Sequence, residues 1–246
     1  MEINSANDIV KNLTATLERD TRVNVHQSPI TVRTENNEVV LEGQVDNIAE
    51  KRAAVDSVTR TLLGQERWSI IDQLHVKPAD HKEDLELKEA VTLALSNEPV
   101  FRDYTLFTKV AENIETLRNK GAGNTEIMAI IEDGCITLSG QVESLSHRRL
   151  VEVLMWWTNG CEYVDNQIEV VPPERDTDNE ITDAVRIVLE KDPLVHASQL
   201  LVGTAGGVVV LSGSLASKEE KTLAILDAWY VPGVADVVDR IETRGK

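Results

Sequence analysis

Hydrophobic and polar residues follow the same pattern three times along the chain. The three copies are VVLEGQV at residues 39–45, ITLSGQV at 136–142 and VVLSGSL at 209–215. Each copy alternates apolar with small or polar residues, which predicts a half-buried strand. Each contains one glycine, at Gly43, Gly140 and Gly213. We interpret these glycines as a structural signature, where the strand bends or bulges at a residue without Cβ.

The residues around each signature predict the same order of elements. Ile9, Leu13 and Leu17 have helical spacing, and a strand is expected at residues 30–32 before the signature strand. Asn47 and Glu50 have the spacing of a capping box that opens a second helix, and a last strand follows at 70–76. Residues 36–37, 133–134 and 206–207 are turn sequences, so the first two strands of each copy should form a hairpin.

The chain is therefore predicted to be α/β (α+β), with three tandem α-β-β-α-β units at residues 1–78, 79–173 and 174–246. The second helix of each unit is long enough for a right-handed crossover, so the third strand should lie parallel to the second. Each unit becomes a three-stranded mixed sheet with two helices on one face. Units of about 70 residues are marginally stable alone. Packing between units, or homo-oligomer formation through sheet edges or faces, is expected.

The middle unit has an insertion between its first helix and its first strand. Leu106 or Phe107, Val110, Ile114 and Leu117 recur at helical spacing, which predicts an inserted helix near residues 103–119. This helix either covers the open side of the unit, or serves as a pocket lid or a partner-binding helix. Its surroundings supply the contact candidates Phe101, Tyr104 and Phe107. Trp156 is a fourth candidate, because its neighbour Trp157 shares the apolar stripe with Val153 and Leu154, which leaves Trp156 on the solvent side.

The order of elements, the apolar-x-Leu-x-Gly-x-apolar pattern and the closing apolar-x-[Asp/Asn]-x-[Ile/Leu] resemble the BON domain, named from bacterial osmotic-shock and nodulation proteins. The second copy matches best, whereas the first has Asn37 for the turn glycine and Glu42 for the serine, and the third has Asp239 for the asparagine. The resemblance implies a non-enzymatic binding module. It also implies an association with phospholipid surfaces, envelope stress or the sensing of small ligands and ions.

The charge of the chain limits the classes of partner that it can bind. The chain has 246 residues and a net charge of −17, which opposes nucleic-acid binding and simple adsorption to anionic lipid. Residues 79–173 contain 8 basic and 17 acidic residues, a net of −9. The N-terminus has no signal-peptide pattern and no apolar run reaches the length of a transmembrane segment, so we expect a soluble, cytoplasmic chain. Cys135 and Cys161 lack CxxC spacing and are expected to be reduced thiols.

No residue set predicts catalysis, a cofactor or a metal. The histidines lack metal-ligand spacing and no P-loop occurs. Asp176, Asp178 and Glu180 begin like a calcium loop but lack its later glycine and glutamate, so helix capping explains them better. The expected function is a binding or scaffold protein in a stress response that engages a membrane surface or a protein partner. The alternative is a sensor of a small ligand or a monovalent cation.

Overall fold

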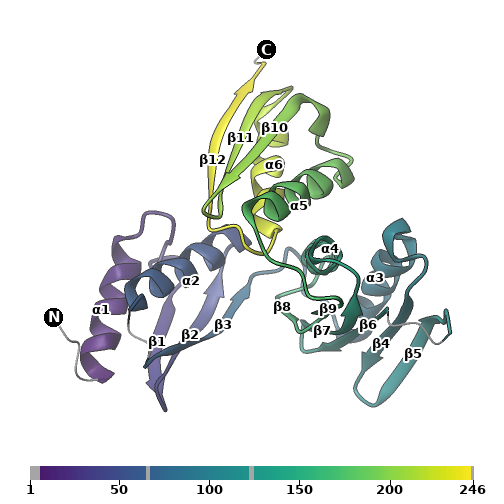
Figure 1. Cartoon of the computed structure of the whole chain (residues 1–246). Helices are drawn as coiled ribbons and strands as arrows, with labels where there is room; N and C mark the ends of the chain where they lie inside the picture. Colours follow the sequence, from purple (N-terminus) through teal and green to yellow (C-terminus); the bar gives the residue numbers. More distant parts are fainter. Residues whose placement is uncertain (1–5, 65–66, 122–124, 245–246) are drawn as a thin grey trace. The chain divides into compact units, whose positions relative to one another are not determined.

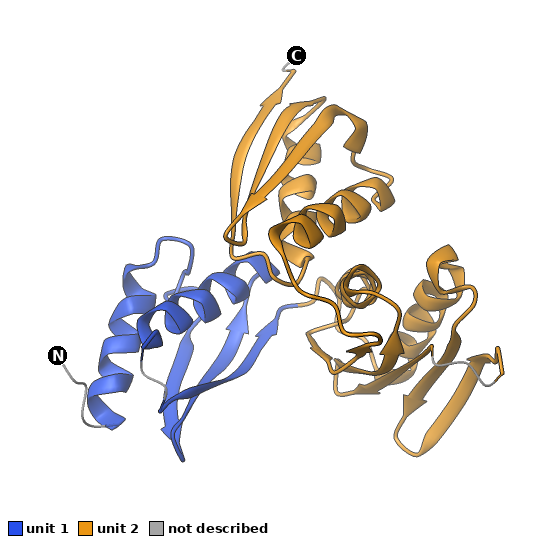
Figure 2. Ribbon diagram, in the orientation of Figure 1, with its two compact units in different colours: residues 1–77 blue, residues 78–246 orange. Residues whose placement is uncertain are grey.

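The computed structural model describes residues 6–64, 67–121 and 125–244 (Figure 1). They form two compact units, Met1–Lys77 and Pro78–Lys246 (Figure 2). The first unit contains one repeat, and the second contains two repeats packed together. We keep residues 79–173 and 174–246 as the proposed boundaries of repeats 2 and 3, because Pro172-Pro173 separates them.

Repeat 1 has the predicted order of elements: α1 (Ala6–Arg19), β1 (Ile30–Glu35), β2 (Glu38–Val45), α2 (Ile48–Leu62) and β3 (Ser69–Val76). β1 pairs antiparallel with β2, and β3 pairs parallel with β2. The helices bury their apolar stripes on one face of this sheet. Ile9, Leu13 and Leu17 of α1 pack with Val39 and Leu41 of β2 in the core.

Repeat 3 has the same topology. Its elements are α5 (Asp178–Lys191), the short helix η2 (Ala197–Gln199), β10 (Leu200–Ala205), β11 (Val208–Leu215), α6 (Lys218–Tyr230) and β12 (Asp236–Thr243). β11 is again the middle strand, antiparallel to β10 and parallel to β12. Both predicted three-stranded mixed sheets are therefore confirmed.

Repeat 2 has the same framework with a larger sheet. Its elements are α3 (Asp84–Asn97), η1 (Pro99–Phe101), β4 (Thr105–Val110), β5 (Asn113–Arg118), β6 (Glu126–Glu132), β7 (Cys135–Val142), α4 (Leu145–Trp156), β8 (Tyr163–Asn166) and β9 (Glu169–Val170). The strand order is β5-β4-β6-β7-β8, and β9 continues beside β7. β4 lies parallel to β6, along the edge to which no described strand pairs in the other two sheets.

The inserted helix predicted near residues 103–119 is wrong, because this segment forms the β4–β5 hairpin. Leu106 and Thr108 are buried, whereas the alternate residues Phe107 and Lys109 are half-exposed. The burial period is therefore two residues, as in a strand, rather than 3.6. The segment is rich in β-branched residues, and the free edge of β6 supplies backbone hydrogen-bond partners. The apolar spacing alone is compatible with a helix, and it is pairing with β6 that makes this segment a strand.

The strand pairing continues at the signature glycines without a register shift, so a close backbone approach rather than a bulge explains them. Leu41, Leu138 and Leu211 all lie fully buried in the middle strands. Gly43, Gly140 and Gly213 have φ values of +148°, +122° and +135°. A Cβ at these positions would lie 2.5, 2.1 and 2.1 Å from the carbonyl oxygens of Pro29, Glu126 and Gln199. Backbone conformation and backbone proximity therefore both require glycine.

The predicted turns and the Asn47 cap are confirmed, and the other two repeats have equivalent caps. Asn36 and Asn37, Asp133 and Gly134, and Gly206 and Gly207 all have positive φ, as the tight turn of a two-residue hairpin requires. Asn47, Ser144 and Ser217 each accept a hydrogen bond from the backbone N–H three residues later, at the start of α2, α4 and α6.

We predict that Gly213→Ala destabilises repeat 3 by at least about 1–3 kcal/mol, the cost of a strained backbone residue. Gly203→Ala is the matched control, because no described atom lies within 4 Å of the position that a Cβ would take there. It should be neutral or slightly stabilising. Hydrogen exchange of the β10–β12 amides in the full chain measures the stability change caused by each substitution. Equal effects of the two substitutions would contradict the close approach between Gly213 and the carbonyl of Gln199.

Candidate interaction surface

Two buried carboxylates serve the fold. Glu50 accepts hydrogen bonds from the backbone N–H groups of Asn24 and Asp46 and from the Ser28 hydroxyl. Glu220 accepts from the backbone N–H groups of His196 and Ala216. Each carboxylate ties the loop after the first helix of its repeat to the start of the second helix, so it is occupied structurally.

Repeat 2 makes the same connection with different chemistry. His147 occupies the place of the glutamate, and its Nδ1 lies 2.7 Å from the hydroxyl oxygen of Tyr104. This hydroxyl also accepts a hydrogen bond from the backbone N–H of Glu143. Burial lowers the pKa of His147 and raises the pKa of Tyr104. Tyr104 and His147 therefore replace the buried carboxylate of the sister repeats.

Of the four contact candidates, three are buried. Phe101 and Tyr104 pack edge to face with each other and with His147 inside repeat 2. Trp156 is buried and Trp157 is half-exposed, the reverse of the prediction. The reason is that α4 packs on its own sheet and also against α5 and α6 of repeat 3. Phe107 remains accessible, but the structure does not bring it together with the other three at a surface.

The closing Asp or Asn is structural as well. Asp72, Asn166 and Asp239 each accept a hydrogen bond from the backbone N–H two residues later. Lys51 and Lys221 also form ion pairs with Asp72 and Asp239 at 2.6 Å. The polar positions that recur in the repeats are thus used for turns, caps and strand ends.

Within the described residues, no group of three or more His, Cys, Asp or Glu side chains is placed to hold a metal ion. Cys135 and Cys161 are free thiols, and burial raises the pKa of both. Asp178, considered above for a calcium loop, instead accepts hydrogen bonds from the backbone N–H groups of Gly206 and Gly207.

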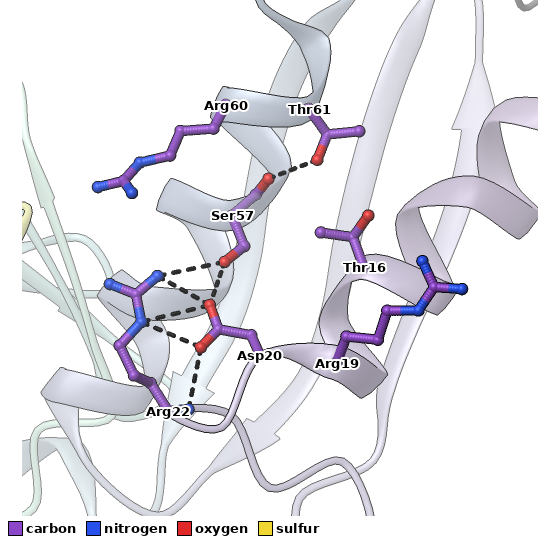
Figure 3. A pocket seen from close by; sticks show the side chains of 7 residues that line it. All are labelled: Thr16, Arg19, Asp20, Arg22, Ser57, Arg60 and Thr61. Atoms are coloured by element: carbon purple, nitrogen blue, oxygen red, sulfur yellow. Dashed lines mark hydrogen bonds and ion pairs between the residues drawn. The ribbon is translucent and has the colours of Figure 1, made fainter.

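A pocket of about 390 Å³ in repeat 1 contains several arginines (Figure 3). Its lining residues are Thr16, Arg19, Asp20, Arg22, Ser57, Arg60 and Thr61. Asp20 lies between Arg19 and Arg60, whose guanidinium groups point away from each other (Figure 3). Arg22 and Arg60 instead both bind Asp56, so the chain's own carboxylates already pair with these two arginines.

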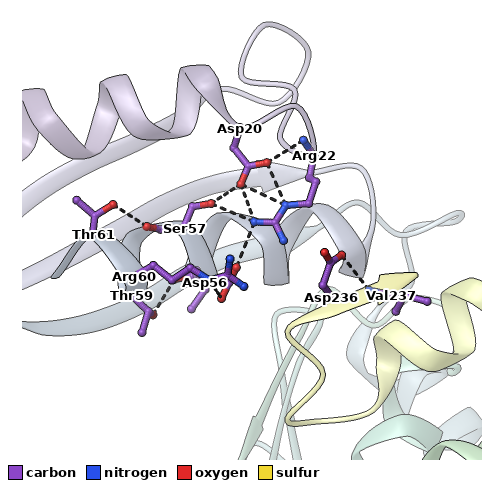
Figure 4. A network of polar contacts seen from close by, with 10 residues as sticks. Asp20, Arg22, Asp56, Ser57, Thr59, Arg60, Thr61, Asp236 and Val237 are labelled. Atoms are coloured by element: carbon purple, nitrogen blue, oxygen red, sulfur yellow. Dashed lines mark hydrogen bonds and ion pairs between the residues drawn. The ribbon is translucent and has the colours of Figure 1, made fainter. Parts of the chain in front are cut away.

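The polar network beside this pocket connects α2 to the end of α1 (Figure 4). Arg22 binds Asp20 with Nε–Oδ1 at 3.0 Å and reaches Asp56 with Nη2–Oδ2 at 3.1 Å. Arg60 binds the same Asp56 at 2.9 Å. The hydrogen bond from Arg22 holds the pKa of Asp20 well below its usual range. The network is a structural ion-pair cluster that sequence spacing does not reveal, because the segments 20–22 and 56–60 that it joins are far apart in the sequence.

Repeats 2 and 3 meet at a polar contact that sequence spacing does not reveal either. Arg149 on α4 is 3% exposed. Its Nη2 lies 2.6 and 2.7 Å from the carboxylate oxygens of Asp176, and its Nε donates to the carbonyl of Pro232 at 2.9 Å. Lys191 at the end of α5 binds the buried carboxylate of Glu98 at 2.8 and 2.9 Å. These pairs fix α4 and the end of α3 against repeat 3.

A buried carboxyl group lies in the same contact region. Asp227 on α6 is 3% exposed, and it shares hydrogen bonds with Asp192 and Trp157. Desolvation, followed by the charge of Asp192, raises the pKa of Asp227 to about 8. At neutral pH this side chain is therefore mostly protonated, and the proton joins the two carboxyl groups.

The sheet of repeat 2 has a face that its two helices do not cover. The strands bury Leu106, Ile127, Ala129, Ile136 and Leu138 on the side where α3 and α4 pack. Strand alternation and register place the intervening side chains on the opposite side. We call this opposite side the open face; it carries Phe107, Lys109, Ile114, Thr116, Glu126, Met128, Ile130, Glu132, Thr137, Ser139, Asp165 and Glu169.

The open face carries large apolar side chains around Lys109. Phe107 pairs with Met128 across β4 and β6, and Lys109 pairs with both Ile114 and Ile130. Ile114 is 58% exposed, and Phe107, Met128 and Ile130 are half-exposed. Four large apolar side chains on three adjacent strands form the candidate interaction surface of the chain. The spacing of alternate residues in 105–132 would have identified it, had the segment been predicted as strands.

The BON domain model matches residues 5–78, 105–172 and 177–245. The chain belongs to the BON domain family, with three tandem copies. The middle match begins at β4 and leaves out α3, although α3 packs on its sheet as α1 and α5 do on theirs. The family consists of non-catalytic binding modules.

Comparisons with curated proteins and with solved structures do not extend the family assignment. A search of curated proteins finds no match to the chain. The chain is similar to solved structures of CdsD, a structural protein of the type III secretion system of Chlamydia trachomatis. One, of its C-terminal domain, has 14% identity over 100% of both chains and a TM-score of 0.25. A second has 14% identity over 96% of this chain and 92% of that chain, with a TM-score of 0.24. Likenesses at these TM-scores carry no argument about this chain.

We predict a pH dependence from Asp227. Because its pKa is raised in the folded state, the unfolded chain loses this proton near pH 4 while the folded chain keeps it to about pH 8. The free energy of unfolding therefore falls as the pH rises through that window. Asp227→Asn removes this loss of stability. The melting temperature of the variant minus that of the unsubstituted chain should therefore grow as the pH rises from about 4.5 to 8.5. Glu190→Gln, an exposed change on α5, is the control. A pH-independent difference for Asp227→Asn would contradict the buried carboxyl pair.

Proposed function

We propose that the chain is a non-catalytic binding or scaffold protein whose repeat 2 engages a protein partner through the open face. One observation carries this proposal: among the described parts of the three repeats, repeat 2 alone combines an enlarged sheet with large apolar residues on its uncovered side. Membership of a family of binding modules supports it. A role in a stress response rests on the family association.

A protein partner is favoured over a lipid surface by charge. The net charge of −17, and the carboxylates of Glu126, Glu132, Asp165 and Glu169 on the open face, would be repelled by anionic headgroups. Within the described residues, no helix has both the length and the apolar character that a membrane span requires.

The buried carboxyl pair favours a second candidate function, the sensing of a small ligand or a monovalent cation. Asp227 Oδ2 is buried without a hydrogen-bond partner among the described residues, next to the contact between repeats 2 and 3. A cation that displaced the shared proton into solvent would bind both carboxylates and tighten this contact. Thermal melts of the full chain with a panel of ions and metabolites test the idea. A ligand present at 100 times its Kd raises the free energy of unfolding by about 2.7 kcal/mol. The shift should disappear in Asp227→Asn.

We predict that amine-reactive crosslinking in intact host cells joins Lys109 of the open face repeatedly to one partner protein. Lys218, exposed on α6, is the internal control and should give few crosslinks to that partner. Co-sedimentation of the purified chain with vesicles of anionic lipid should be weak.

Two outcomes would refute a protein-binding role. One is the absence of recurrent protein crosslinks from any lysine, together with a large melting shift from a single small ligand. The other is strong vesicle binding without any crosslinked protein.

A further inference from the structure

We propose that the open face binds an amphipathic helix whose apolar stripe is flanked by Lys or Arg residues. This inference rests on the proposed function, because it names the class of partner for that surface. It is carried by the size of the apolar patch, by the charges around it and by comparison with the equivalent faces of the other two repeats.

The apolar patch has the width of one helix. Phe107 lies on β4, Ile114 on β5, and Met128 and Ile130 on β6. Neighbouring strands are about 4.8 Å apart, so three strands span about 10 Å. An α-helix with side chains is about 10–12 Å across. A single helix would cover all four apolar residues.

The charges of the open face select a basic partner. Glu126 and Glu132 lie on the same side of β6, about 20 Å apart at about 3.3 Å per residue, with the apolar patch between them. Asp165 and Glu169 lie on the same face along β8 and β9. Lys109 is the single basic side chain that the described strands of repeat 2 place there. Positive groups beside an apolar stripe would pair with these carboxylates at the ends of β6 and along β8 and β9.

The same charges argue against other occupants. A second copy of the chain would present the same carboxylates and would be repelled. Anionic lipid and nucleic acid would be repelled for the same reason.

The sister repeats show that the fold does not require this patch. The residues paired with the signature glycines, Ile30, Ile127 and Leu200, align the three faces. In that alignment Met128 corresponds to Thr31 and Leu201, and Ile130 corresponds to Arg33 and Gly203. Arg33 forms ion pairs with Glu35 and Glu42, so the face of repeat 1 is polar at the position where repeat 2 has isoleucine. At the two compared positions repeat 3 has the exposed Leu201 and Gly203, which has no side chain.

The test uses the full chain and three designed helical peptides. The first has a leucine stripe flanked by lysines, the second has glutamates in place of the lysines, and the third has alanines in place of the leucines. Fluorescence anisotropy measures each Kd, and hydrogen exchange locates the bound peptide. The variant Phe107→Thr with Ile130→Thr removes the patch with residues that suit strands. Leu201→Thr is the matched control on repeat 3.

We expect the leucine-lysine peptide to bind best and to protect β4 and β6 from exchange. The double variant should weaken its binding by about tenfold or more, and Leu201→Thr should leave it unchanged. Glu126→Gln with Glu132→Gln is a second variant that leaves the apolar patch and the strands intact. It should weaken binding and reduce its dependence on salt.

Several results would overturn the inference. Undiminished binding by both double variants would place the peptide on another surface; it would refute the open face as the binding site and leave only a general binding role for the chain. Equal affinity for the glutamate peptide, or for the alanine peptide, would refute the partner class. Self-association or vesicle binding that the Phe107→Thr with Ile130→Thr variant abolishes would assign the face to a second copy or to lipid. Failure of all three peptides to bind, together with no protein crosslinks in cells, would reject the proposed function as well.

Discussion

The close approach between each signature glycine and a backbone carbonyl is the constraint on which the three sheets depend. Gly43, Gly140 and Gly213 lie opposite the first residue of the neighbouring strand or the residue after it, where a Cβ would collide with a backbone oxygen. A backbone oxygen cannot move aside as a flexible side chain can. The glycine therefore fixes the register of the first two strands in every repeat.

Register determines which side chains face the helices. A shift by one residue would exchange the two faces of a strand. With the register fixed, Leu138 and Ala129 lie beneath α3 and α4, and Met128 and Ile130 lie on the open face. The candidate surface of repeat 2 is thus a direct consequence of the glycine contact. The repeated polar residues stabilise the same arrangement, since Glu50, Glu220 and the Tyr104–His147 pair connect each first helix to the second.

Much of this fold could be predicted from the sequence because it rests on local signals. The turns, the capping residues and the alternation around each glycine are all contained within a few neighbouring positions. The inserted segment was mispredicted because Leu106, Val110, Ile114 and Leu117 fit helical spacing, and only the edge of β6 decides for strands. The burial of Trp156 could not be predicted, because α4 packs on its own sheet and also against α5 and α6 of repeat 3. The pairing of Asp227 with Asp192 also depends on tertiary contacts that sequence spacing does not reveal.

The proposed function rests on the part of repeat 2 that the shared framework does not use. In all three copies the recurrent polar residues form turns, caps and strand ends. Repeat 2 adds two strands and an apolar face that the shared framework does not require. Hydroxyl-radical footprinting of the full chain tests this most directly, because Met128 lies on the open face and Met155 is fully buried in α4. The account predicts rapid oxidation of Met128 and strong protection of Met155. Equal protection of the two methionines would show that the face is covered within the chain and would contradict the account.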